Sequence, residues 1–325
     1  MKRLCTSDWQ LADGARDRYR LSFVANELPK LIEKYKPDQL LVLGDITEAK
    51  DAHPAPLVNE IVDIFYNLSQ QCEVIILQGN HDFLHKEHPY FQFVSNFKNV
   101  HWVATSVIKE NCLWLPHTRD YKSDWAGINL KDDYDFVFAH NIFTGVNAAN
   151  GHALAGIPPT IFGSNTVISG DVHEPQIVNG NVIYVGSPFT TDFGDDFQGR
   201  VLLLDDLKIK SIKVYGQQKR LVNWDWGKNP THNANENDIV KINVHIQMED
   251  VANWATIRQE VENWAAKNKF VLGGGVIPNV AYVKGERQKV VKSIRKTDHQ
   301  YLDQFTKRSG IDERTAAVGQ EIVDL

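Results

Sequence analysis

The sequence predicts an α/β protein whose large first domain mixes parallel and antiparallel strands, followed by a compact βαβ unit and two short helices. Three observations predict this class: short apolar runs alternate with helical patterns in the first half, hairpin signals follow residue 166, and a polar segment precedes a last strand–helix–strand pattern. The chain has 325 residues, which exceeds the commonest domain size and predicts one large domain with a smaller one.

Short apolar runs with turn or polar residues after them indicate buried strands in the first half. These runs are residues 3–7, 40–43, 73–77, 112–115 and 135–139. Between the first three runs, apolar residues recur at helical spacing, from Leu21 to Leu31 and from Leu57 to Leu68. Alternating strands and helices predict parallel pairing at the centre of a sheet.

After residue 166 the pattern changes to short strands joined by tight turns, with Asn179-Gly180 as a strong hairpin signal. We therefore expect antiparallel strands to complete a first domain over residues 1–228. Residues 226–238 are polar and rich in Asn, which predicts a linker.

The segment beyond the predicted linker has a second, smaller pattern. A strand is predicted at 239–246, then a helix with an apolar stripe from Val251 to Trp264, then a strand at 279–285. This βαβ unit predicts a capping domain over residues 237–297. The last part, 298–325, predicts two short helices that separate at Ser309-Gly310.

Composition and charge limit the classes of function. Hydrophobic residues make up 42% of the chain, enough for a core, and the net charge of −6 argues against a basic coat for nucleic acid. The three cysteines, Cys5, Cys72 and Cys112, are odd in number and widely spaced, which indicates reduced core residues. No apolar run approaches 18 residues and no signal peptide is evident, so we expect a cytoplasmic protein without a membrane span.

Five short polar stretches each follow an apolar strand. They are Asp8-Trp9-Gln10, Gly44-Asp45, Gly79-Asn80-His81-Asp82, His140-Asn141 and Gly170-Asp171-Val172-His173. The carboxyl ends of strands form the ligand crevice of an open α/β sheet, so these side chains are expected to converge. Such a set suits two divalent cations about 3.5–4 Å apart, which neutralise a phosphate ester and activate water. Asp45 can bridge the pair.

This ordered set resembles the calcineurin-like metallophosphoesterases, whose pattern runs Asp-x-His, Gly-Asp, Gly-Asn-His-Asp/Glu, a lone His and Gly-His-x-His. The resemblance covers roughly residues 1–215 and implies a mixed β-sandwich flanked by helices. It further implies a ligand set with Asp45 as the bridge: Asp8, Gln10 and His173 at the first metal, and Asn80, His140 and Asp171 at the second. His81 is then expected to protonate the leaving group, and Asp82 to orient His81 through a hydrogen bond.

Gln10 and Asp171 depart from the family pattern, which has His at both positions. Each metal loses one imidazole, and the replacements offer an amide oxygen and a carboxylate. The resemblance then implies an oxygen-rich site that favours manganese, or magnesium, over zinc. The alternative is a domain that has lost metal binding. The intact Asn80-His81-Asp82 stretch favours retained activity, because a general acid has no use without a metal site.

Simpler roles remain open for single residues. Asp8 and Asp45 can instead cap helices, and His140 can be a hydrogen-bonded core histidine. His117 also ends a strand, and we expect it to have a structural or solvent-exposed role.

Three local features resemble the SbcD-type nuclease subunits of DNA repair complexes: "TSDW" followed by Leu11, "HEPQ" at 173–176, and "VIYVGSPFTTDFGDD" at 182–196. The order of phosphoesterase domain, small capping domain and helical segment is similar as well. The resemblance implies a DNA nuclease that acts in repair or recombination and binds an SbcC-like coiled-coil ATPase through 298–325. The short chain is similar to bacteriophage versions, which implies the host cytoplasm as its location.

Two basic runs are candidates for DNA contact. The first comprises Lys208, Lys210, Lys213, Lys219 and Arg220, and the second comprises Lys284, Arg287, Lys289, Lys292, Arg295 and Lys296. The second flanks the capping domain and can bind phosphates, although a solvated charged face is an equal interpretation. Because the net charge of the chain is negative, we expect much of the DNA affinity to come from a partner or from a homodimer.

Two other functions compete with the DNA nuclease. One is a stand-alone phosphodiesterase or phosphatase for small or cyclic nucleotides, and the other is a non-catalytic scaffold with a degenerate metal site. The region after residue 237 favours the nuclease, because an enzyme for small molecules has no evident need of a capping domain.

Overall fold

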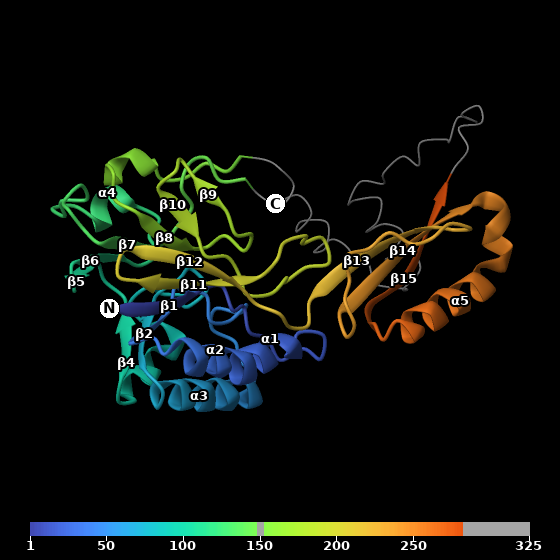
Figure 1. Cartoon of the computed structure of the whole chain (residues 1–325), viewed down its shortest axis with the longest axis horizontal. Coiled ribbons are helices and arrows are strands. Elements are labelled where there is room, and N and C mark those ends of the chain that lie inside the picture. The colour runs from blue at the N-terminus through green and yellow to red at the C-terminus, as the bar shows by residue number, and fades with distance from the viewer. Residues whose placement is uncertain (148–152, 282–325) are drawn as a thin grey trace, which may run out of the picture. The chain divides into compact units, whose positions relative to one another are not determined.

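The computed structural model describes residues 1–147 and 153–281 (Figure 1). The chain divides into two compact units, residues 1–279 and 280–325, and the elements below lie in the first unit except for the last two residues of β15. The helices expected at 298–325 and the candidate DNA-binding residues Lys284, Arg287, Lys289 and Lys292 lie outside the described residues.

Two six-stranded sheets form the first part of the chain. The first has the order β12-β11-β1-β2-β3-β4, with bounds β1 (Lys2–Thr6), β2 (Gln39–Val42), β3 (Glu73–Leu77), β4 (Val100–Val103), β11 (Arg200–Asp205) and β12 (Lys208–Lys213). The second has the order β5-β6-β7-β8-β10-β9, with bounds β5 (Val107–Lys109), β6 (Cys112–Leu115), β7 (Phe136–His140), β8 (Val167–Gly170), β9 (Ile177–Val178) and β10 (Val182–Tyr184).

Both sheets mix the two pairing directions, as the sequence predicts. The central strands β1 to β3 and β6 to β8 pair in parallel, whereas β11 and β12 form an antiparallel hairpin. Asn179 and Gly180 both have positive φ, at 50° and 78°, in the turn between β9 and β10. This matches the predicted hairpin, because a tight turn of the right twist needs positive φ at both central residues.

Side chains alternate between the two faces of each strand, and this alternation lets the first sheet pack against a layer on each side. On β1, Leu4 packs with the residues of the flanking helices, and the next residue, Cys5, packs with Trp114 and Phe138 of the second sheet. Successive side chains of a strand point to opposite faces, so the first sheet is buried on both sides. Figure 1 shows α1 to α3 along one side of this sheet and α4 beside the second sheet. The result is a helix–sheet–sheet sandwich.

Among the helices of the described residues, α3 and α5 are long and the others are short. Their bounds are α1 (Arg18–Ser22), π-helix η1 (Phe23–Glu27), α2 (Leu28–Tyr35), α3 (Ala55–Ser69), 3-10 helix η2 (Tyr90–Asn96), α4 (Tyr121–Asp124), 3-10 helices η3 (Pro159–Phe162) and η4 (Met248–Asn253), and α5 (Trp254–Lys267). The described residues contain no helix long and apolar enough to cross a membrane.

A third sheet follows, with the order β13 (Lys219–Asp225), β14 (Ile239–Gln247) and β15 (Val271–Ala281). We call these strands, with η4 and α5, the cap. β13 lies inside the predicted first domain, yet it pairs in parallel with β14. Residues 226–238, predicted as a linker, therefore connect two neighbouring strands of one sheet.

The last strand is displaced from its prediction. β15 begins at Val271, whereas the sequence pattern predicted a strand at 279–285. The three glycines at 273–275 look like a strand breaker in the sequence. In the structure Gly273 and Gly274 allow close approach, since a Cβ would lie 2.2 Å from Cγ2 of Ile239 at the first and 2.4 Å from Cβ of Lys241 at the second.

Candidate metal centre

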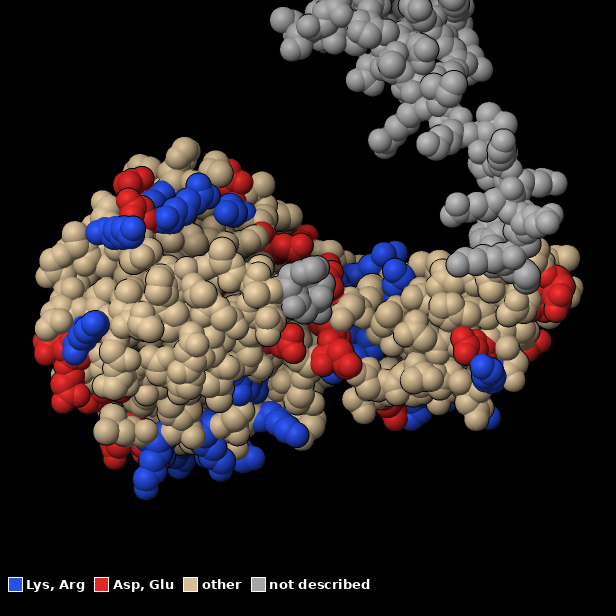
Figure 2. Space-filling model, turned by 90° about the horizontal axis from the view of Figure 1, so that it is seen from above, with Lys and Arg blue, Asp and Glu red and all other residues tan. Residues whose placement is uncertain are grey.

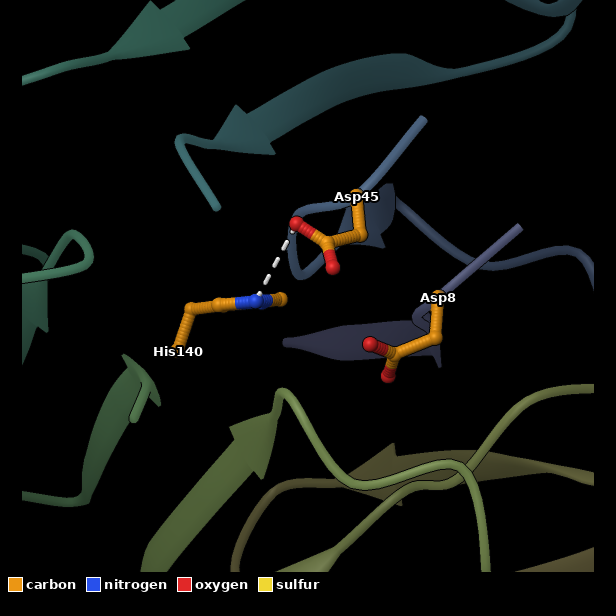
Figure 3. Close-up of side chains that lie close together, drawn as sticks. All are labelled: Asp8, Asp45 and His140. Atoms are coloured by element: carbon orange, nitrogen blue, oxygen red, sulfur yellow. Dashed lines mark ion pairs between the residues drawn. The ribbon is translucent and has the colours of Figure 1, made fainter. Parts of the chain in front are cut away.

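The ends of five strands bring the predicted ligands to one place. Asp8, Asp45 and His140 follow or end β1, β2 and β7, and each offers a ligand atom within 4.8 Å of the other two. All three side chains are buried. Figure 3 shows both carboxylates and the imidazole directed toward a common space, with Asp45 paired to His140. The convergence predicted from the strand ends is therefore present for these residues.

The backbone turns sharply at four of the predicted positions. Asp8, Gln10, Asp45 and Asp171 have φ values of 53°, 45°, 59° and 80°. Residues other than glycine adopt positive φ rarely and at a cost, and such residues gather at functional sites. At Gly44, with φ of 86°, a Cβ would lie 2.4 Å from Nδ1 of His140, so only glycine lets the ring approach.

His140 is oriented as a metal ligand. Its Nδ1–H donates to the Leu43 carbonyl at 2.6 Å, which leaves Nε2 facing Oδ1 of Asp45 at 3.3 Å and Oδ1 of Asp171 at 3.8 Å. A hydrogen bond from one ring nitrogen to a carbonyl is the usual way in which a ligating histidine is fixed. Burial lowers the pKa of His140, but the carboxylates of Asp45, Asp171 and Asp8 outweigh it and raise this pKa well above its ordinary value.

The position of the Asn80 carboxamide indicates whether the site can bind a cation. Its oxygen lies 3.0 Å from Nε2 of His140, and the same atom position is 3.1 Å from both carboxylate oxygens of Asp45. When Nε2 of His140 carries no proton, the amide satisfies these acceptors in one of two ways: its amino group donates to them, or its oxygen joins them around a cation. Lone pairs from an imidazole, a carboxylate and an amide facing one point suit a divalent metal.

Asp8 is held by neighbouring donors. Ser7 Oγ donates to Oδ2 of Asp8 at 2.5 Å, and the backbone N–H of Asp171 donates to Oδ1 at 3.1 Å. Burial raises the pKa of Asp8 to about 6. A nearby cation would favour the ionised form, so metal binding and proton release are coupled at this carboxyl group.

Gln10 and His173, which were predicted as ligands of the first metal, line the same cavity as Asp45. The Gln10 side chain points into the site, where its Nε2 donates to Oδ2 of Asp45 at 2.8 Å. The His173 ring is fixed by a hydrogen bond between Nδ1 and Oγ1 of Thr191 at 3.1 Å. Because Nδ1 is engaged, Nε2 is the nitrogen of His173 that can bind a metal.

A cavity of about 250 Å³ opens over these residues. Its lining comprises Gln10, Asp45, Asn80, His81, Asp171 and His173, together with Arg20, Glu48, Thr191 and Asp192. The last four were not predicted as site residues. Thr191 and Asp192 lie in the stretch 182–196, which was used only for its local resemblance, and Arg20 and Glu48 lie outside the five polar stretches. A larger cavity of about 430 Å³, beside Phe193 and Leu221, contains none of the predicted ligands.

The predicted hydrogen bond from Asp82 to His81 is absent, which corrects that expectation. The Asp82 carboxylate is buried and accepts from the backbone N–H groups of Asp45, Ile46 and Gly79, at 3.0, 2.9 and 2.7 Å. The His81 ring is instead fixed by the Glu48 carbonyl, 2.7 Å from Nδ1. The Asp82 oxygens therefore face the backbone of the two loops, and the His81 ring faces Glu48.

His117 has the structural contact that was expected. Its Nδ1 lies 3.2 Å from the His140 carbonyl, and its ring is half-buried. Burial, and then the neighbouring His140, lower the pKa of His117. This favours the neutral ring beside His140.

The first predicted basic run does not form one surface. Lys208, Lys210 and Lys213 are exposed on the edge strand β12, but Lys219 and Arg220 are buried at the start of β13. Lys219 Nζ pairs with Oδ1 of Asp17 at 2.7 Å. Figure 2 shows lysine and arginine side chains in separate groups, with Asp and Glu side chains between them.

Comparison with known proteins agrees with this geometry. A sequence model of the calcineurin-like phosphoesterase family matches residues 1–175. None of the curated proteins matches the chain.

Solved structures that match the chain include several phosphoesterases. A nuclease from Pseudomonas putida is 15% identical, with 65% of this chain and 87% of that chain covered and a TM-score of 0.33. The phosphoesterase Yfce from E. coli is 15% identical, with 63% and 89% covered and a TM-score of 0.34. A phosphatase from Mycoplasma pneumoniae is 14% identical, with 67% and 94% covered and a TM-score of 0.40. These identities are too low to indicate a substrate.

Proposed function

We propose that this chain, which belongs to the calcineurin-like phosphoesterase family and is a metal-dependent phosphoesterase, hydrolyses phosphodiester bonds in DNA. The observation that carries the phosphoesterase chemistry is the convergence of Asp8, Asp45 and His140 beneath the cavity that His81 lines. The choice of DNA is supported by the local likeness to SbcD-type nucleases and by the cap that follows the two sheets.

The residues of the chain have separate roles in this chemistry. Bound divalent cations supply an activated water and neutralise charge on the phosphate. Asp8, Asp45 and His140 would hold these cations, and Asn80 lines the cavity where the phosphate would develop additional negative charge. His81 is held through Nδ1 by the Glu48 carbonyl, so its Nε2 is free to donate a proton to the departing sugar oxygen.

The donor set favours manganese or magnesium in this proposal. Three carboxylates, from Asp8, Asp45 and Asp171, and two amides, from Gln10 and Asn80, surround the site, whereas His140 and His173 supply its imidazoles. Hard oxygen donors suit these ions better than zinc, which favours nitrogen and sulfur ligands.

The likeness to SbcD-type nucleases supports a coiled-coil ATPase as the partner of this chain. The segment proposed to bind it, 298–325, lies outside the described residues. Deleting 298–325 is expected to abolish co-purification with such an ATPase while sparing cleavage of simple DNA substrates. A truncated chain that still co-purifies fully with the ATPase would refute this docking role.

A second candidate is a phosphodiesterase for small or cyclic nucleotides. It is favoured by the small cavity, about 250 Å³, and by the acidic side chains Glu48 and Asp192 in its lining, which would repel a long polyanion. The basic groups in Figure 2 are also scattered.

Parallel assays separate these functions. Purified protein in millimolar manganese is given either linear duplex DNA or a cyclic nucleotide, with a chelator-treated sample and His81→Ala as controls. Our proposal predicts manganese-dependent digestion of DNA. Hydrolysis of the cyclic nucleotide alone would favour the second candidate, and neither activity, with no bound metal, would indicate a non-catalytic scaffold.

A further inference from the structure

A buried arginine at the edge of the cavity directs its N–H groups to acceptors within the protein. Arg20, in α1, is 3% exposed and lines the cavity. Its Nη1 donates to the Gln10 carbonyl at 2.6 Å and to Oε2 of Glu48 at 3.0 Å. Its Nη2 donates to the Thr191 carbonyl at 3.1 Å and lies 2.9 Å from Oδ1 of Asp17, while Nε faces Tyr19 Oη at 3.4 Å.

The three segments that Arg20 joins each hold a different group of the site. The Gln10 side chain donates to Asp45, the proposed bridge. The Glu48 carbonyl fixes the His81 ring. Thr191 Oγ1 fixes the ring of His173.

We infer that Arg20 is a positioning residue that sets the geometry of the metal ligands on the Gln10 and His173 side and of the proton donor. Its planar guanidinium reaches the three loops in three directions from one fixed centre. Those loops come from residues 10, 48 and 191, which are far apart in the chain. Backbone bonds from Gln10 to Asp45 and from Glu48 to Leu11 already join the first two loops. Arg20 joins the 191 loop to both of them, and Lys219 Nζ and Tyr19 Oη donate to the carbonyls of residues 191 and 190 beside it.

The same contacts argue against a role for Arg20 in binding phosphate. All three of its nitrogen atoms already face acceptors, and two of these acceptors are the carboxylates of Asp17 and Glu48. A guanidinium has five N–H donors, so a substrate phosphate would have to displace one of these partners.

The lysine variant tests this role because it keeps the charge but loses the geometry. An ammonium group offers its donors from one point and cannot reach the three loops together. Removing a group that orients metal ligands typically weakens metal affinity by about 10–100-fold. We expect Arg20→Lys to bind manganese more weakly by a factor in that range.

The matched control is Arg3→Lys. Arg3 is also 3% exposed, and its guanidinium contacts Gln39 and Glu110 at the opposite end of β1 from the site. Titration calorimetry of the full chains with manganese alone gives the affinities, and far-ultraviolet circular dichroism with a thermal melt reports folding. Arg3→Lys should retain the natural affinity, even if its melting temperature falls.

Arg20→Lys that folds and binds manganese as tightly as the natural chain would overturn the inference. So would an equal loss of affinity in both variants, since this would indicate general destabilisation. If Arg20→Lys does not fold, Thr191→Val tests the same arrangement, because it removes the hydroxyl that fixes His173 and leaves Arg20 in place. Unchanged manganese affinity in Thr191→Val would then count against the inference that Arg20 positions the metal ligands. This outcome is independent of whether DNA is the substrate, because only the metal is titrated.

Discussion

His81 is the residue on which proton transfer depends. Its Nδ1 is fixed by a carbonyl, its backbone N–H donates to Asp45 Oδ1 at 2.8 Å, and among the described residues its ring is not part of the cluster formed by Asp8, Asp45 and His140. His81→Ala is expected to slow hydrolysis by about 10²–10⁴-fold and to leave manganese affinity nearly unchanged. Steady-state kinetics and calorimetry measure the two effects. Loss of metal together with activity would contradict the general-acid role.

Gln10 occupies the position where the family has histidine, and its side chain faces Asp45. Gln10→His would add an imidazole ligand on the His173 side. We expect tighter manganese binding and a larger gain in zinc affinity, because zinc favours nitrogen ligands. Competition with a metal-sensitive dye measures both. If neither affinity changes, the side chain at position 10 does not contact a metal.

Protonation of the ligands should compete with the metal. Burial raises the pKa of Asp8 to about 6, and the surrounding carboxylates raise the pKa of His140 despite its burial. Both groups must lose a proton to bind a cation, so manganese affinity should fall as the pH falls, first through the raised pKa of His140 and again through about 6 at Asp8, with proton release on binding. Calorimetry at pH 6 and pH 9, in buffers of different ionisation enthalpy, measures this release. Binding heats independent of the buffer at pH 6 would contradict the assignment of these ligands.

The ligand positions were predictable at the residue scale because they follow strand ends in recognisable motifs. Asp8, Asp45 and His140 converge as expected. The partners that orient them were not predictable. The Glu48 carbonyl and the Arg20 guanidinium act through loop geometry, and any residue can supply a carbonyl.

At the scale of elements, Asp82 ties the loop after β2 to the loop after β3. Its carboxylate accepts three backbone N–H groups, two of them on one oxygen. Asp82→Asn places an amino group against at least one of these donors, so we expect a loss of roughly 1–3 kcal/mol in the free energy of unfolding. Urea denaturation measures this, with the exposed Asp206→Asn as a control that should change little. Equal stability of Asp82→Asn and the natural chain would show that the tether is dispensable.

Elements with a clear hydrophobic periodicity were predictable, and elements whose bounds depend on tertiary contacts were not. α3 and the strands β3 and β6 lie where their apolar patterns predicted them. β15 begins earlier than predicted, because Gly273 serves close strand packing that a local pattern does not reveal.

At the scale of the whole molecule, the sandwich of two sheets explains why distant ligands meet. The central strands β1, β2 and β3 pair in parallel, as do β6, β7 and β8, so each sheet presents its carboxyl ends at one edge. Stacking brings the two edges together, and residues 8 and 140 become neighbours. The sequence predicted this convergence from the polar residues that follow the strand ends.

The central claim, that these edges hold two cations on either side of Asp45, has a direct test. Crystals grown with manganese, measured at its absorption edge, should show two anomalous peaks roughly 3.5–4 Å apart. Both should lie within bonding distance of Asp45, with His140 at one and Asp8 at the other. Absence of peaks there, or manganese bound only elsewhere on the chain, would contradict the account.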